Sequence, residues 1–404
     1  MNKYLLRYNY WRVERSVRRA ARSVWFELAT LCLPYTLRTS SGKRFEELGS
    51  LLEDYLLDQM NRSPEAGREM ASQLLNVLKN CDTITYNEPG TGNAYALLHF
   101  LDRYHRFQLT FDLLTRHKLM PLKHTVIDVL DIGTGPGPSM FALSDFYCQR
   151  FGYVDTSRAH RDRPRFRIDY VERSVEFRHW LHHFTEYANF HAPTGRHWYV
   201  PYHHGTFGDF KAIDFDEAIT SWDQDDDGDY APTTYIRHHR FDLVIFSNFL
   251  TTRPQVLQFQ KELRDCARFL RHNGILLVVG ATTTSAKYRQ VYDTISEIIL
   301  GQGYGSRNFT AWCERVNVEP HILSYQWGDP YGERVKRHLG AVYSVLEARH
   351  HEAVADAATR ILNASIKIDY NRTNAWQILV FRKIARPRRK NRSLKRKNVK
   401  TQVS

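Results

Sequence analysis

The sequence lacks several features that mark other classes of protein. No apolar run approaches the ~18 residues that a membrane-spanning helix requires. The five cysteines are odd in number and far apart, which argues against a disulfide framework and against a cysteine-based zinc or iron–sulfur site. A reducing, cytoplasmic environment fits them best. The chain also has no cysteine-nucleophile motif, no serine nucleophile elbow and no metal-binding His/Glu helix motif.

Metal binding is not indicated by the residues that could provide it. The acidic run Asp223–Asp229 matches the first half of a calcium loop, but Thr234 stands at the twelfth position, where a bidentate glutamate is required. A solvated acidic insertion loop is therefore favoured. Adjacent histidine rings lack the spacing of metal ligands. The adjacent pairs are His182-His183, His203-His204, His238-His239 and His350-His351.

Positive charge is concentrated at the two ends of the chain. The net charge is +13, yet eleven lysines or arginines and no acidic residue follow from Arg382 onward, and seven more lie within residues 1–22. The interior is consequently slightly acidic. We expect affinity for RNA or another polyanion to come from the basic tail Arg382–Lys400 and from the N-terminal arginines. Residues 384–404 have no periodicity and are expected to be disordered.

Residues 1–120 predict a helical N-terminal region. Tyr4–Cys32 is a basic amphipathic pattern with three open interpretations: a helix covering the domain, an arm for nucleic acid or a membrane surface, or an arginine-rich transit peptide. Further helices are expected at Phe45–Met60, Ser63–Leu78 and Ala94–Leu119, the second with Ser63 as its N-cap.

The stretch Thr125–Ile132 is an apolar run rich in β-branched residues, and three alternating glycines follow it. This pattern predicts a buried parallel strand that turns sharply into a helix, with Pro138 at the first helical position. Such turns hold nucleotides, because glycine reaches positive φ and leaves room for a ligand. The spacing matches neither the G-x-G-x-x-G fingerprint of dinucleotide-binding domains nor a P-loop, which needs G-K-[ST].

The remaining pattern, Asp131-x-Gly133-x-Gly135-x-Gly137, resembles motif I of the class I S-adenosylmethionine-dependent methyltransferases. In that family the glycine turn packs against the methionine part of the cofactor, and the acidic residue supports the loop. The resemblance implies S-adenosylmethionine as cofactor. It also implies an α/β, Rossmann-like sheet of seven mostly parallel strands with an antiparallel last strand. It covers about residues 121–383, with insertions.

Two further carboxylates resemble cofactor-binding positions of this family. Glu172 ends the expected second strand, Phe166–Glu172, where a carboxylate accepts the ribose hydroxyl hydrogens. An insertion at Arg150–Arg165 is needed to reach it, and a helix is expected at Ser174–Tyr187. Asp209 resembles the acidic residue that meets the adenine amine. The third strand is expected near Trp198–Pro201.

The segment Arg240–Thr252 resembles the fourth strand, whose end faces the transferred methyl group. Ser247 and Asn248 are therefore candidate catalytic residues. The Pro-Pro-aromatic sequence of enzymes that methylate base amines does not follow Asn248, so that reaction is not indicated. The remaining expected elements are a helix at Val256–Leu270, a strand at Ile275–Gly280, helices at Tyr288–Leu300 and Val335–Leu362, and paired strands at Ser365–Tyr370 and Ala375–Lys383.

The leading hypothesis is a methyltransferase that acts on RNA or a ribonucleoprotein. The helical N-terminal region, the Gly-Pro-Gly in motif I and the basic ends resemble ribosome-associated methyltransferase-like proteins, although their cysteine clusters are missing here. A non-catalytic binding or assembly protein and a protein or small-molecule methyltransferase are the alternatives. Possible cleft contacts before the first strand are Tyr86, Asn87, Tyr95 and Tyr104.

Overall fold

The computed structural model describes part of the chain. The described residues are 43–80, 86–122, 126–150, 166–192, 216–224, 230–238, 240–282, 286–301, 313–326, 340–350 and 373–384. The basic N-terminal pattern, the expected third strand, Asp209 and the tail after residue 384 lie outside them.

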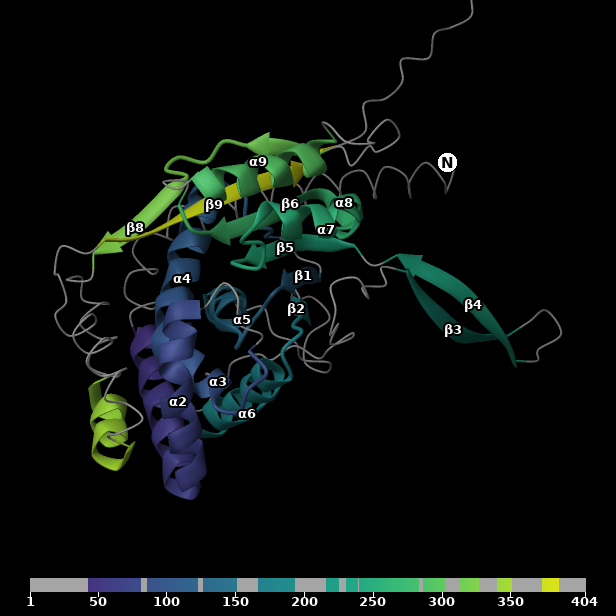
Figure 1. Cartoon of the computed structure of the whole chain (residues 1–404). Helices are drawn as coiled ribbons and strands as arrows, with labels where there is room; N and C mark the ends of the chain where they lie inside the picture. Colours follow the sequence, from purple (N-terminus) through teal and green to yellow (C-terminus); the bar gives the residue numbers. More distant parts are fainter. Residues whose placement is uncertain are drawn as a thin grey trace, which may run out of the picture.

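One mixed sheet organises the described chain (Figure 1). Its strands are β1 (Ile127–Ile132), β2 (Phe166–Val171), β5 (Phe241–Ser247), β6 (Leu270–Gly280), β7 (Cys313–Val316), β8 (Ile322–Gln326) and β9 (Thr373–Lys383). Their order is β2-β1-β5-β6-β9-β7, and β8 also pairs with β9. The pairs among β2, β1, β5 and β6 are parallel, whereas β9 is antiparallel to each of its partners. This architecture confirms the predicted mostly parallel sheet with an antiparallel last strand.

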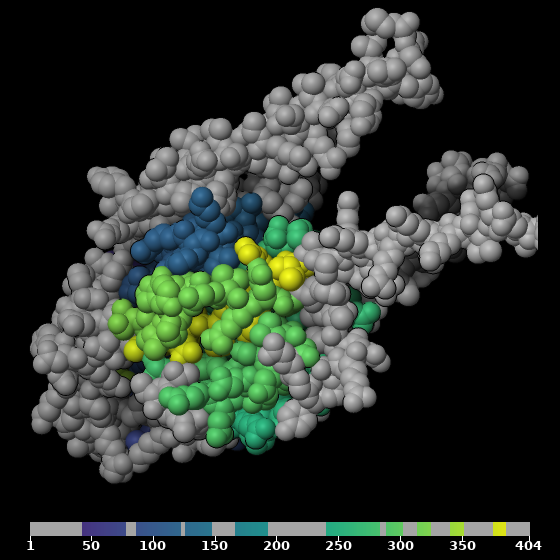
Figure 2. All heavy atoms as spheres, turned by 90° about the horizontal axis from the view of Figure 1, so that it is seen from above, coloured from purple at the N-terminus to yellow at the C-terminus, as the bar shows by residue number. Residues whose placement is uncertain are grey.

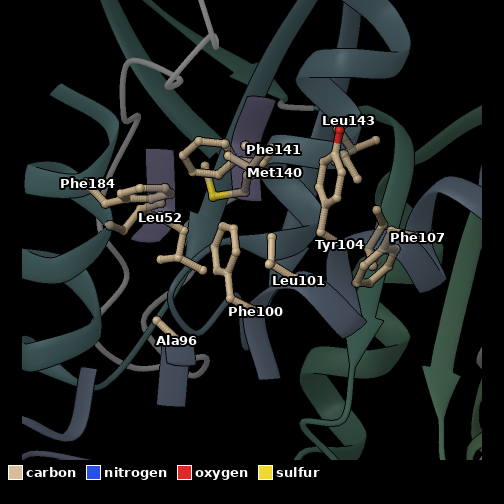
Figure 3. Packing of buried hydrophobic residues seen from close by; sticks show 14 of the residues in the cluster. Leu52, Ala96, Phe100, Leu101, Tyr104, Phe107, Met140, Phe141, Leu143 and Phe184 are labelled. Carbon is tan, nitrogen blue, oxygen red and sulfur yellow. The ribbon is translucent and has the colours of Figure 1, made fainter. Parts of the chain in front are cut away.

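Helices cover both faces of the sheet, because its central strands alternate between two apolar clusters. In β5, Leu243 and Ile245 join one cluster and Val244 joins the other. The first cluster also holds residues of the N-terminal helices, and Figure 3 shows its aromatic centre. Its helices are residues 43–62, α2 (Pro64–Asn80), α3 (Thr91–Tyr95), η1 (Ala96–Phe100), α4 (Leu101–Arg116), α5 (Pro138–Ser144), η2 (Asp145–Arg150), α6 (Val175–His191) and residues 340–350. The second face carries α7 (Arg253–Gln258), α8 (Gln260–Phe269) and α9 (Ala286–Leu300).

Two local predictions differ from the structure, and a third lies outside the described residues. The expected helix Val256–Leu270 is two helices, because the backbone at Phe259 leaves the helical region. The expected strand at Ile275 begins earlier, at Leu270, and Asn273 lies inside it with a φ of 64°. The strand expected at Ser365–Tyr370 lies outside the described residues; among those described, β9 pairs with β6, β7 and β8.

Strands β3 (Asp216–Gln224) and β4 (Tyr230–His238) form a separate antiparallel hairpin that projects from the body (Figure 1). Asp223 and Thr234 belong to these strands, so the expected acidic loop is wrong for Asp223, and residues 225–229 lie outside the described part. Among the described helices, none combines the length and apolarity needed to cross a membrane.

A buried polar network fixes α4 against the rest of the fold. The Arg44 Nε donates to the Asp145 carboxylate at 2.8 Å, and the Tyr104 hydroxyl donates to its other oxygen at 3.3 Å. The Trp376 indole of β9 donates to the Thr110 hydroxyl at 3.1 Å. Viewed from above, the blue segment that carries α4 lies beside yellow β9 (Figure 2). These bonds hold one face of α4 above the sheet.

Candidate active site

A cavity of about 380 Å³ opens at the carboxyl ends of the parallel strands. This edge is where open α/β sheets bind ligands, because the loops after successive strands converge there. Among the described residues it is lined by Tyr86, Tyr95, Arg103, Arg106, Gly133, Gly135, Glu172, Phe177, Ser247, Asn248, Phe249, Thr251, Gln255, Ala281, Tyr288 and Ala375.

The glycine turn after β1 requires glycine for different reasons at its three positions. All three have positive φ: 72° at Gly133, 60° at Gly135 and 91° at Gly137. A Cβ on Gly133 would lie 2.7 Å from the Phe249 Cβ. A Cβ on Gly135 would meet nothing nearer than 3.9 Å. Gly135 therefore leaves an open surface where it lines the cavity.

Gly137 does not line the cavity but contributes to the packing of the helices. It is the N-cap of α5, where Pro138 takes the first turn as expected. A Cβ there would clash with a methyl carbon of Leu181 on α6. The third glycine of the motif thus allows α5 and α6 to pack closely.

Glu172 follows β2 directly and connects three parts of the site. Its Oε2 accepts from the Gly135 amide and its Oε1 from the Ser174 amide, each at 2.7 Å. Burial raises the pKa of this carboxyl, and the two amide donors oppose that shift. Since a carboxylate has about four lone-pair sites, each oxygen can accept a further hydrogen bond from a ligand.

Asp131 lies at the end of β1, fully buried and behind the cavity lining. Its Oδ2 accepts from the Ser139 hydroxyl on α5, which ties the strand to the helix after the turn. Its Oδ1 is buried without a hydrogen-bond partner. Burial raises the pKa of Asp131 to about 6, and the nearby Glu172 adds to the shift. Asp131 thus supports the turn from beneath.

We expect Asp131→Asn to change how stability depends on pH. The native pKa of about 6 exceeds the ordinary value of 3.8, so the folded state holds this proton more tightly than the unfolded chain. That stabilisation is complete below about pH 4 and is lost as the pH rises through 6. The Tm of the variant minus that of the wild type should therefore increase between pH 4.5 and 7. An unchanged difference would contradict the shifted pKa, and exposed Asp293→Asn is the control.

Ser247 and Asn248 lie at the end of β5, on the cavity wall, as expected. Asn248 has a φ of 48°, which is uncommon for a residue other than glycine. Its amide nitrogen donates to the Val279 carbonyl at 2.9 Å, and its side-chain Nδ2 donates to the Ser247 hydroxyl at 3.2 Å. These bonds fix both side chains beside the glycine turn.

Aromatic residues form the opposite wall. The Tyr86 ring lies 4.8 Å from Phe177, and the Tyr95 ring lies 5.1 Å from it. Ser174 caps α6 and also donates to the Tyr86 carbonyl. Tyr104 is instead buried in the core, and Asn87 is not among the lining residues.

Several lining residues are not predicted from the sequence, chiefly Arg103, Arg106, Gln255 and Tyr288. The sequence contains one signal for the two arginines. Their spacing of three residues predicts that they lie on the same face of a helix. Within the described residues, no group of three or more histidine, cysteine, aspartate or glutamate side chains is arranged to hold a metal ion.

Comparisons with known proteins give matches only among solved structures. No family model matches the sequence, and no curated protein matches it. Similar structures include a SAM-dependent methyltransferase from Methanosarcina mazei, with 8% identity and a TM-score of 0.34 over 67% of this chain and 97% of that chain. Phosphoethanolamine N-methyltransferase 2 from Haemonchus contortus has 13% identity and a TM-score of 0.36 over 78% of this chain and 61% of that chain. Magnesium protoporphyrin IX methyltransferase from Synechocystis PCC 6803 has 10% identity and a TM-score of 0.32 over 72% of this chain and 93% of that chain.

Two features of this chain distinguish its sheet from that of an ordinary dinucleotide-binding domain. The antiparallel strand β9 lies between β6 and β7, and the turn after β1 carries alternating glycines without the G-x-G-x-x-G spacing. Glu172 and Asn248 occupy the ends of the strands on either side of β1. The described chain therefore has a Rossmann-like sheet in which an antiparallel strand follows the parallel strands.

Proposed function

We propose that this protein transfers a methyl group from S-adenosylmethionine to an acceptor bound in the same cavity. The observation that carries the proposal is the surface at Gly135, which is open to a ligand and lies beside the buried carboxylate of Glu172. A turn that presents bare backbone next to a hydroxyl-accepting carboxylate fits a nucleoside with an extended substituent.

The chain's residues divide the binding of this cofactor between them. Glu172 accepts the ribose hydroxyl hydrogens, and Gly133 and Gly135 pack against the methionine part. Asp131 holds the turn through Ser139, and Gly137 lets α5 pack on α6. Asp209 remains the proposed partner of the adenine amine. When bound, S-adenosylmethionine supplies an electrophilic methyl group on a sulfonium centre.

Positioning accounts for much of the expected catalysis. Ser247 and Asn248 orient the acceptor nucleophile at the end of β5, where the hydrogen bond between them fixes both groups. The aromatic wall of Tyr86, Tyr95 and Phe177 limits the water around the reacting atoms. A general base is needed only for an acceptor that must lose its proton early.

Labelled methyl transfer tests this proposal. Full-length protein is incubated with methyl-labelled S-adenosylmethionine and fractionated cell extract, and cofactor affinity is measured in parallel. We expect one fraction to become labelled, and Glu172→Gln to label it far less. Cofactor binding without transfer to any fraction would favour the binding or assembly alternative. Absence of cofactor binding would contradict both.

RNA or a ribonucleoprotein is the proposed acceptor class, supported by the basic ends of the chain. Two of the basic residues counted with the tail are engaged in the fold. Arg382 pairs with Glu314 at 2.9 Å, and the Lys383 Nζ donates to the Ala267 carbonyl at 2.8 Å. Affinity for RNA would therefore come from residues after 384.

Deleting residues 384–404 should weaken RNA binding about tenfold or more and reduce the slope of log affinity against log salt concentration, because the tail supplies phosphate contacts. Cofactor affinity should be unchanged, since the cavity lies elsewhere in the chain. Filter binding at several salt concentrations measures both effects. An unchanged salt slope would rule the tail out as an RNA-binding segment.

A further inference from the structure

The charged groups of the cavity are segregated. Among its described lining residues, the charged side chains are Glu172, Arg103 and Arg106. Glu172 follows β2, whereas the Arg106 guanidinium lies 5.7 Å from the ring of Trp376 on β9. Since β1, β5 and β6 lie between those two strands in the sheet, Glu172 and Arg106 belong to different sides of the cavity lining. The cavity thus has an acidic end and a cationic end.

Arg106 is held in place with part of its hydrogen-bonding capacity left over. Its Nη2 pairs with Asp102 on the preceding turn at 2.9 Å, and both side chains are mostly buried, at 19% and 12% exposed. Its Nε is buried without a hydrogen-bond partner. The Thr110 hydroxyl, which accepts from Trp376, also donates to the Arg106 carbonyl at 2.8 Å.

Arg103 adds a second cation on the same face of α4, three residues before Arg106. Its guanidinium lies 5.8 Å from the Tyr95 ring, over the aromatic wall. The neighbouring histidine responds to this charge. The pKa of His99 is lowered to about 3, first by burial and then by Arg103; Asp102 opposes this shift and Arg106 adds to it. With one carboxylate, Asp102, beside two guanidinium groups, this face of α4 carries a net positive charge.

We propose that Arg106 and Arg103 bind a phosphate or carboxylate group of the methyl acceptor. Planar guanidinium groups recognise both anions through paired hydrogen bonds, and a partly desolvated site strengthens such bonds. This inference rests on the proposed function, because the acidic end then holds the cofactor ribose and the cationic end holds the acceptor. The carboxylate of the cofactor is the competing source of the anion, and the experiment separates the two.

Thermal stability of the full-length protein saturated with S-adenosylhomocysteine tests the site. Inorganic phosphate and acetate are added at constant ionic strength. We expect one of them or both to raise the Tm by about 2 °C near ten times its Kd. A response to phosphate alone assigns a phosphorylated acceptor, and a response to acetate alone assigns a carboxylate. The absence of any response would overturn the proposal.

Variants locate the response. Arg106→Gln should abolish the response and Arg106→Lys should weaken it. Arg68→Gln, at an exposed position of α2, should leave it intact. The double variant Asp102→Asn with Arg106→Gln removes the ion pair as a unit, so that loss of the response is not due to an unpaired buried carboxylate. Retention of the response in both Arg106→Gln proteins would contradict the site.

Cofactor affinity distinguishes the acceptor's anion from that of the cofactor. S-adenosylhomocysteine should bind Arg106→Gln within about twofold of the wild type. A tenfold loss, or displacement of phosphate by S-adenosylhomocysteine, would assign the arginines to the cofactor carboxylate and overturn the proposal. If the wild type binds no cofactor, the proposed function fails, and the phosphate response of the cofactor-free protein still decides whether Arg106 binds an anion.

Discussion

Replacing Gly135 with alanine is expected to lower the affinity for S-adenosylmethionine about a hundredfold while the protein stays folded. The added methyl group would project into open space within the cavity, where the nearest atom is 3.9 Å away. It therefore competes with the cofactor and not with the protein. The positive φ of 60° adds a cost of about 1–2 kcal/mol in stability. Calorimetric titration measures the affinity, and thermal unfolding measures the stability.

Gly301→Ala is the matched control for this backbone cost. Gly301 follows α9 with a φ of 73° and does not line the cavity. It should lower the Tm by a similar amount and leave cofactor affinity unchanged. If Gly135→Ala binds the cofactor as tightly as the wild type, the glycine turn does not contact it.

Glu172→Gln is the second substitution with a large expected effect, again about a hundredfold in cofactor affinity. Glutamine replaces one of the two carboxylate oxygens with an NH₂ group, which cannot accept a hydrogen bond. Either the Gly135 amide or the Ser174 amide therefore loses its acceptor. One amide of the turn then faces another donor, and the ribose loses an acceptor. The variant tests the connection between β2, the glycine turn and α6 in a single measurement.

The pH dependence of binding gives this substitution a second readout. Because burial raises the pKa of Glu172, the carboxyl gains its proton at a higher pH than an exposed glutamate does. Wild-type affinity should therefore fall as the pH is lowered, and Glu172→Gln should lack this dependence. Glu176→Gln, in the first turn of α6, is the control. An affinity for that control as low as for Glu172→Gln would indicate a general loss of structure.

The parts of the fold that sequence predicts best are those governed by local patterns. The strand before Gly133 and the Ser63 cap of α2 follow from β-branched runs, glycine spacing and capping chemistry, all of which act within a few residues. The edge strands β7 and β8 were missed because they are short and partly exposed. Their pairing with β9 is set by contacts distant in sequence. The split at Phe259 likewise has no strong sequence signal.

The candidate site also contains residues that the sequence predicts and residues that it does not. Five lining residues could be predicted to share one site because each lies at or just after the carboxyl end of a strand: Gly133, Gly135, Glu172, Ser247 and Asn248. A motif alone could not separate Gly137 and Asp131, which support the turn, from the glycines that line the cavity. Recognising the arginines of α4 as lining residues required knowing which face of that helix covers the sheet. That orientation depends on tertiary contacts such as the bond from Trp376 to Thr110.

A crystal structure of the protein with S-adenosylhomocysteine tests the central claim most directly. We expect the ribose hydroxyls within hydrogen-bonding distance of Glu172, the amino-acid part of the ligand against Gly133 and Gly135, and the sulfur facing Ser247 and Asn248. Density for the ligand elsewhere, or a cavity that remains empty at saturating concentration, would contradict a methyltransferase site at the glycine turn.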